Sequence, residues 1–73
     1  MINVLNKALG KEVDIDTLEF FANRNDWIYM GKDLFEDTLI FIDDFVNGRE
    51  IDVMVEFVSE DRVKIKKIIK KYF

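Results

Sequence analysis

Acidic side chains dominate the residues of this chain that could do chemistry, and several of them flank an Asn47-Gly48 pair. An Asn-Gly pair between two apolar runs, here "TLIFI" and "IDVMVEF", is typical of a two-residue β-hairpin turn. With that turn, Asp43 lies opposite Asp52, although like charges that face each other on a sheet are unfavourable. Two neighbouring carboxylates could act as a general acid and base, or could bind a hard cation.

Neither catalysis nor metal binding fits the rest of the sequence. A pair of carboxylates catalyses a reaction only inside a cleft around the substrate, and 73 residues leave little room for one. The chain has no His and no Cys, and it lacks the G-x-S-x-G, G-x-G-x-x-G and Walker motifs. The acidic stretch "DIDTLE" lacks the central glycine of a calcium loop. We therefore predict a protein that is not an enzyme and that uses neither a metal nor another cofactor.

The register of the hairpin decides which side chains accompany these carboxylates. A two-residue type I′ turn places Ile42 opposite Val53 on the core face, and Phe41 opposite Met54 on the other face. That second face then mixes apolar and acidic side chains, namely Leu39, Phe41 and Met54 with Asp43, Glu50, Asp52 and Glu56. A Gly bulge at the turn would shift the register by one residue and pair Phe41 with Val53. The face outside the core would then hold Ile40, Ile42 and Met54 with Asp44 and Glu50. In both registers "TLIFI" is apolar on its two faces.

Three segments before the hairpin have to support it. Apolar residues at helical spacing in "MINVLNKALG" predict a helix that ends at Gly10. Asp16, with Glu19 three residues later, predicts the start of a second helix over residues 17 to 24. The β-rich run "WIYM" predicts a short strand that joins the hairpin.

The end of the chain, "SEDRVKIKKIIKKYF", fits two structures. The spacing of Ile65, Ile68 and Ile69 predicts an amphipathic helix that begins near a capping serine. Val63 and Ile65 instead alternate as in a strand, so a hairpin through "SEDR" is the main alternative. With the helix, residues 1–73 form a single α+β domain. Its sheet has three mostly antiparallel strands, covered by two N-terminal helices and a C-terminal amphipathic helix.

The charges of the chain are unevenly distributed. The net charge is −4, all 15 acidic residues precede Arg62, and six of the 11 basic residues lie from Arg62 onward. Four lysines of the predicted last helix could contact phosphates of a nucleic acid: Lys66, Lys67, Lys70 and Lys71. Nucleic-acid binding is nevertheless an unfavoured alternative, because the acidic remainder of the protein would repel phosphates.

The location of the protein is predicted from what the sequence lacks. The chain has no cysteine for disulfides, no basic leader with a cleavage site and no apolar run of 18 residues. We therefore expect a cytoplasmic protein that does not associate with a membrane.

A strand that is apolar on both faces must be covered on both sides, or it exposes an apolar patch. Either the last helix or the "GKDLFED" loop covers the second face, or that face binds a partner. We predict a small acidic protein-binding module that sterically blocks a larger protein or complex, as a non-catalytic inhibitor or regulator of the kind that viruses carry as accessory proteins. The predicted binding residues are the anchors Leu39, Phe41 and Met54 and the charged rim Asp43, Glu50, Asp52 and Glu56. The alternatives are a homodimeric assembly subunit that buries the same patch, and nucleic-acid binding through the lysine-rich helix.

Overall fold

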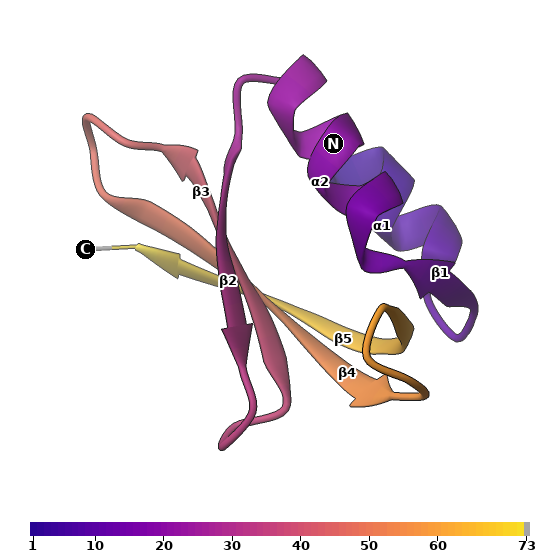
Figure 1. Ribbon diagram of the computed structural model, residues 1–73. Coiled ribbons are helices and arrows are strands. Elements are labelled where there is room, and N and C mark those ends of the chain that lie inside the picture. The colour runs from indigo at the N-terminus through magenta and orange to yellow at the C-terminus, as the bar shows by residue number, and fades with distance from the viewer. Residues whose placement is uncertain (73) are drawn as a thin grey trace.

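The computed structural model describes residues 1–72, which form one five-stranded antiparallel sheet and two helices. In chain order the elements are α1 (Ile2–Ala8), β1 (Glu12–Asp14), α2 (Ile15–Arg24), β2 (Ile28–Asp33), β3 (Thr38–Asp44), β4 (Arg49–Phe57) and β5 (Arg62–Tyr72). The strands are ordered β1-β5-β4-β3-β2 across the sheet. The sheet curls into a half-barrel, and both helices lie against the same face of it (Figure 1).

The predicted architecture is wrong in the number of strands and at the end of the chain. The sheet has five strands instead of three, and residues 62–72 form strand β5 instead of a C-terminal helix. The structure also contains β1, a three-residue strand that no local pattern predicts and that pairs with β5 through Val13 and Val63.

A β-bulge in β5 explains why its sequence resembles that of a helix. Met54 of β4 pairs with Lys67, but the next residue, Val55, pairs with Ile65, so that Lys66 is an extra residue in β5. The bulge changes the spacing of the side chains that face the core from two residues to three. Ile65 is therefore followed at the core by Ile68, and this spacing resembles that of a helix.

Both N-terminal helices are present where the sequence predicts helices, although the second begins earlier. Helix α2 starts at Ile15 and its N-cap is Asp14, whose side chain makes no capping hydrogen bond. Ile15 is buried, and its backbone N–H donates to the carbonyl of Asp61 at 2.8 Å. Tertiary packing thus extends the helix by two residues beyond the predicted start at Thr17.

The β3–β4 hairpin forms, but its connection is longer than the predicted two-residue turn. Residues 45–48 connect Asp44 to Arg49, which face each other as a pair. The Asp44 carboxylate accepts hydrogen bonds from the Asn47 backbone N–H at 3.1 Å and from the Asn47 side-chain amide at 2.6 Å. Gly48 adopts a φ of 69°, a conformation that glycine adopts without strain. The side chain of Asp44 therefore organises a wider turn than an Asn-Gly pair alone would make.

The longer turn and a β-bulge between Ile42 and Asp44 together change the register of the hairpin. Phe41 lies opposite Ile51 instead of Met54, a difference of three residues, and Leu39 lies opposite Val53. The four-residue turn accounts for two of these three residues and by itself would keep the faces, whereas the bulge adds the third, so that the side chains of β3 exchange faces relative to those of β4. The predicted registers, including the opposition of Asp43 and Asp52, are wrong: Asp52 lies opposite Ile40.

The hydrophobic core fills the space between the helices and the sheet. Its buried members are Leu5, Ala8, Ile15, Leu18, Ala22, Leu39, Phe41, Ile51, Val53, Val55, Val63 and Ile65. Phe41 is fully buried, and its ring centroid lies 5.1 Å from that of Tyr29 and 6.2 Å from that of Trp27. In the part of the chain that the structure describes, neither helix has the length and apolar character that crossing a membrane requires.

Candidate binding site on the open face of the sheet

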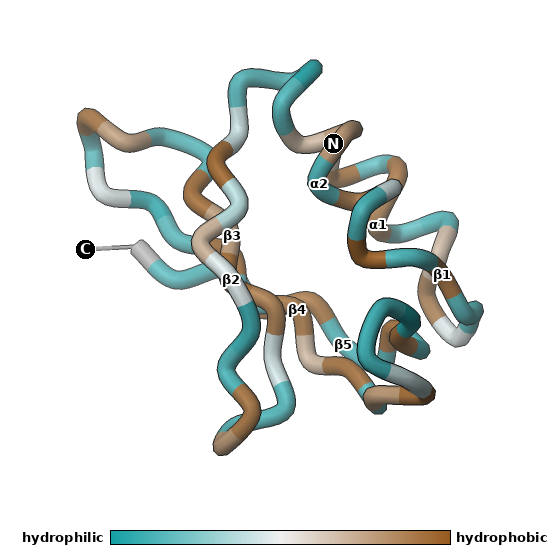
Figure 2. Tube along the Cα trace, in the orientation of Figure 1, coloured by the Kyte–Doolittle hydropathy of each residue, from teal (hydrophilic) through white to brown (hydrophobic). Residues whose placement is uncertain are grey.

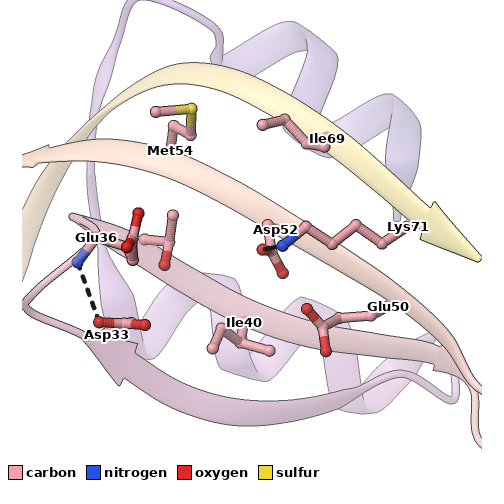
Figure 3. Close-up of a pocket in the computed structure, with 9 residues that line it drawn as sticks. Asp33, Glu36, Ile40, Glu50, Asp52, Met54, Ile69 and Lys71 are labelled. Atoms are coloured by element: carbon pink, nitrogen blue, oxygen red, sulfur yellow. Dashed lines mark hydrogen bonds and ion pairs between the residues drawn. The ribbon is translucent and has the colours of Figure 1, made fainter.

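One face of the sheet carries no helix, and we call it the open face; the face that packs against the helices is the covered face. Side chains alternate between the two faces along each strand. Because Leu39 and Phe41 belong to the core, Ile40 and Ile42 lie on the open face. In Figure 3 this face is toward the viewer and the helices lie behind the sheet.

A hollow of about 520 Å³ lies on the open face, and we call it the acidic hollow. Its lining residues come from the end of β2, the β2–β3 connection, β3, β4 and β5: Asp33, Glu36, Thr38, Ile40, Glu50, Asp52, Met54, Ile69 and Lys71. Four of these side chains are carboxylates and one is an ammonium, so that the hollow carries a net negative charge. Ile40, Met54 and Ile69 give it apolar surface between the charged groups (Figure 3).

Asp52 is the most buried acid in the hollow. The residue is 7% exposed, and its Oδ2 lies 2.7 Å from the Lys71 Nζ (Figure 3). Its Oδ1 is buried and has no hydrogen-bond partner within residues 1–72. A buried carboxylate oxygen without a donor is unfavourable. The ion pair with Lys71 therefore compensates one of the two carboxylate oxygens and leaves the other without a donor.

The charge of Asp52 changes the proton affinity of its neighbours. A hydrogen bond to Asp52, burial and the charge of Asp52 raise the pKa of Glu50, although Lys71 acts in the opposite direction. The hydrogen bond and the charge of Asp52 also raise the pKa of Lys71. When Glu50 is protonated, its hydroxyl can donate to Asp52 and give that carboxylate a second donor. The acids of the hollow therefore stabilise positive charge and bound protons.

The end of β2 and the β2–β3 connection supply the two remaining acids, Asp33 and Glu36. Asp33 Oδ1 accepts hydrogen bonds from the backbone N–H groups of Phe35 and Glu36, each at 3.0 Å. These bonds hold the connection in a tight turn at the border of the hollow. Among the side chains that the structure describes, no three acidic groups converge closely enough to hold a metal ion.

The predicted partner-binding residues divide between the two faces. Four of them lie on the open face: Met54 and the acids Glu50, Asp52 and Glu56. Leu39 and Phe41 are 0% exposed and belong to the core, so they cannot anchor a partner on the surface of this fold. Asp43 lies with Ile51 at a separate hollow beside α1, where its Oδ1 is 3.2 Å from the Arg49 Nε.

The predicted anchors lacked the apolar residues of the open face, although the alternative register with a Gly bulge placed Ile40 and Ile42 beside Met54. Ile40 and Ile42 replace Leu39 and Phe41 on the open face because of the three-residue difference in register. Ile69 joins them from β5, opposite Asp52. The capping preference of Asp44 could have indicated the longer turn, but the faces depend on the bulge between Ile42 and Asp44.

The four C-terminal lysines do not form the single basic face that a helix would give. Lys67 and Lys71 lie opposite Met54 and Glu50 on β4, whereas Lys70 lies opposite the core residue Ile51. The Lys66 Nζ is 3.9 Å from a carboxylate oxygen of Glu56. The lysines are thus spread over both faces and lie among acids, an arrangement that gives little support to the nucleic-acid alternative.

Exposed apolar residues lie at the tips of both hairpins that flank β3. Leu34 and Phe35, after β2, are 71% and 93% exposed. Phe45 and Val46, after β3, are 76% and 91% exposed. In Figure 2 both tips are brown and lie at opposite ends of the hairpins. The open face is therefore bordered at each end of β3 by a projecting apolar turn.

Comparisons with known proteins identify no relative from which a function could be transferred. No protein-family model matches the sequence. No curated protein matches it, and no solved structure matches the fold. The function has to be inferred from the open face itself.

Proposed function

We propose that this protein is a non-catalytic binding module that docks on a larger protein through the open face of its sheet and acts as an inhibitor or regulator. The observation that carries the proposal is the buried carboxylate of Asp52 at the centre of a sheet face that no helix covers. Replacing a buried charged group by an apolar one is often neutral or stabilising. An acid at this position is therefore better explained by recognition than by folding.

The surroundings of Asp52 support a protein partner with a basic surface. Ile40, Met54 and Ile69 supply apolar contact area next to the acids, in the pattern of an apolar centre with a charged border that protein interfaces show. The excess of acids over lysine would attract a positively charged surface and would exclude acidic ones. The absence of cysteine supports a cytoplasmic location as part of the same proposal.

The dimensions of the molecule support a steric mode of action. The chain measures 33 × 25 × 18 Å, and a standard protein interface covers about 800 Å² on each partner. A contact of that size would occupy most of one broad side of the molecule. A protein this small would act mainly by covering a surface of its partner.

Affinity capture from the native cell lysate with matched variants tests the proposal. Ile40→Arg places a positive charge on the open face, whereas Phe20→Arg makes the same type of change at a 55% exposed residue of α2, away from that face. We expect the wild type and Phe20→Arg to capture the same stoichiometric protein and Ile40→Arg to lose it, with all three folded by circular dichroism. Equal capture by all three proteins would refute docking through the open face.

Self-association is the competing outcome, and light scattering at several concentrations measures it. In a symmetric dimer each copy would present the same patch to the other, so the acidic hollows would be brought toward each other and would repel. We therefore expect a monomer. A dimer that Ile40→Arg dissociates would overturn the inhibitor proposal in favour of an assembly subunit.

A further inference from the structure

We infer that the outer side of β5 binds an extended acidic segment of a partner protein as an added antiparallel strand. The contact involves residues 67–72, which we call the free edge of β5. This inference goes beyond the proposed function, because it concerns backbone pairing at an edge of the sheet and an acidic segment, whereas the open face is proposed to bind a basic surface.

The free edge lacks a neighbouring strand on its outer side. β1 pairs only with residues 62–64 of β5. The N–H of Gly10 and the carbonyl of Lys11 then form hydrogen bonds of 2.7 and 3.1 Å with the backbone of Ile65. The chain before Gly10 forms α1, so in the part of the chain that the structure describes nothing pairs with the outer side of residues 67–72.

The free edge has the geometry of a complete strand. Its pairing with β4 runs without a shift from Lys67, opposite Met54, to the end of β5, because the bulge at Lys66 precedes it. Residues 67–72 match the usual strand length of about five to six residues. Figure 1 shows β1 at one end of β5 and the other end extending away from it toward the C-terminus. In such a strand every second residue directs its N–H and C=O to the outer side, and this row of groups can pair with another strand.

β1 shows which kind of strand pairs with this side of β5. Val13 lies opposite Val63 and packs against the core. The two acids of β1, Glu12 and Asp14, lie 2.8 and 2.9 Å from nitrogen atoms of Arg62. The chain thus already places on β5 a short strand that has acids on the open face and an apolar residue on the covered face.

The free edge continues the same chemistry beyond β1. Lys67 lies on the open face opposite Met54, and the half-buried Ile68 lies on the covered face opposite Val53. Lys67 makes no salt bridge with the side chains that the structure describes, and residues 62–72 contain no acid. An added strand with acids beside the lysines and apolar residues beside Ile68 would therefore complete both faces.

The charge of the free edge selects the occupant. Lysines along an edge strand hinder pairing with other strands, and like charges that face each other across two strands are unfavourable. A second copy of β5 would place lysines against lysines, whereas an acidic strand would form favourable cross-strand pairs. The expected occupant is consequently an acidic segment of another protein.

The test is an NMR titration of the full chain with the blocked peptide acetyl-Glu-Val-Glu-Val-Glu-Val-amide, in which acids and valines alternate as in β1. We expect saturable shifts of the backbone amides of residues 67–72. Hydrogen exchange should become slower at alternate amides of this segment, because every second N–H then donates to the peptide. Two control peptides should bind much more weakly: one with lysine in place of glutamate, and one that keeps the glutamates but has methylated backbone nitrogens.

Lys67→Gln and Lys64→Gln form a matched pair of variants. Both make the same change on the same strand and face, but the outer side beside Lys64 is occupied by Glu12. Lys67→Gln should weaken binding of the acidic peptide about threefold, as expected for the loss of one cross-strand pair of opposite charges. Lys64→Gln should weaken it by less than about 1.5-fold, because water and salt screen a more distant charge.

Several results would overturn the inference. Equal weakening by the two variants, or equal binding of the methylated peptide, would show diffuse charge attraction without an added strand. Equal binding of the lysine peptide would show that the edge does not select acids, and the absence of saturable shifts in residues 67–72 would show that it binds no strand.

Two other occupants are distinguished by the same amides. A single-stranded oligonucleotide that shifts them at lower concentration than the peptide would assign the edge to nucleic acid and overturn the inference. Slow exchange at these amides without peptide, increasing with protein concentration, would assign the edge to a second copy and overturn it too. Lys67 does not line the acidic hollow, so this test and the capture assay with Ile40→Arg can fail independently.

Discussion

Replacing Phe41 with alanine should remove a large part of the stability of the fold, whereas the same change at the adjacent residue Ile40 should not. Phe41 is 0% exposed and packs against Tyr29 and Trp27. Truncating a buried phenylalanine costs about 3–5 kcal/mol. For 73 residues, the total free energy of unfolding is about 4–11 kcal/mol. Phe41→Ala therefore leaves the protein close to its unfolding threshold.

Ile40 is only half-buried and faces the acidic hollow. Its truncation opens no closed cavity, and we expect it to cost about 1 kcal/mol. The expected difference between the two variants is therefore about 2–4 kcal/mol. The effects on partner capture should be reversed: Ile40→Ala removes a contact of the docking surface, and Phe41→Ala acts only by reducing the amount of folded protein.

Urea unfolding, followed by the fluorescence of Trp27 and by circular dichroism, measures both variants. With an m-value of about 1 kcal/mol/M for a protein of this size, the midpoint should fall by about 3 M or more for Phe41→Ala. For Ile40→Ala it should fall by about 1 M. A stable Phe41→Ala that has lost its partner, together with a strongly destabilised Ile40→Ala, would refute the assignment of faces and would restore the register expected from a two-residue turn.

Three further substitutions test the electrostatics of the fold. The pKa of Glu50 is raised in the folded protein, so Glu50 stabilises the fold at acidic pH and this stabilisation is lost as the pH rises through that pKa. Glu50→Gln should therefore raise the melting temperature by a few degrees at pH 7 and should lose this advantage near pH 4. Calorimetry at the two pH values measures the difference. The pKa of Asp44 is lowered, chiefly by its hydrogen bonds from Asn47, so Asp44 stabilises the fold at neutral pH and this stabilisation is lost as the pH falls. Asp44→Ala should lower the melting temperature at pH 7 and have no effect at about pH 2. An equal loss at both pH values would contradict this. Arg62→Met removes both ion pairs that join β5 to β1. Because exposed ion pairs contribute little to global stability, the melting temperature should change little, whereas amide hydrogen exchange in β1 should become faster. Unchanged exchange would show that these ion pairs do not hold β1 on β5.

Local patterns in the sequence determined the elements whose signals lie within a few residues. Apolar spacing and Gly10 predicted α1, and the alternating or β-rich runs predicted β2, β3 and β4. Alternation along one strand does not depend on what that strand pairs with. For that reason the sequence alone placed Glu50, Asp52, Met54 and Glu56 on a common face of β4.

The residues that join them were decided by the tertiary structure. A turn of four residues closed by Asp44, together with a β-bulge between Ile42 and Asp44, places Phe41 opposite Ile51. The bulge makes the difference in register odd, and this puts Ile40, and not Phe41, beside the acids. The Asn-Gly pair suits a shorter turn as well, and the two turns alone would leave Phe41 on the same face. Burial of Phe41 against the helices had to select the bulged register.

The two remaining strands also depend on contacts between distant segments. β1 is a three-residue strand that exists only through its pairing with β5, about 50 residues later in the chain. The extra residue Lys66 gives β5 a spacing that resembles a helix, and local propensity cannot distinguish the two structures. The long edge of β4 decides between them, because β5 as a strand satisfies the backbone groups along β4 and covers the core with Val63 and Ile65.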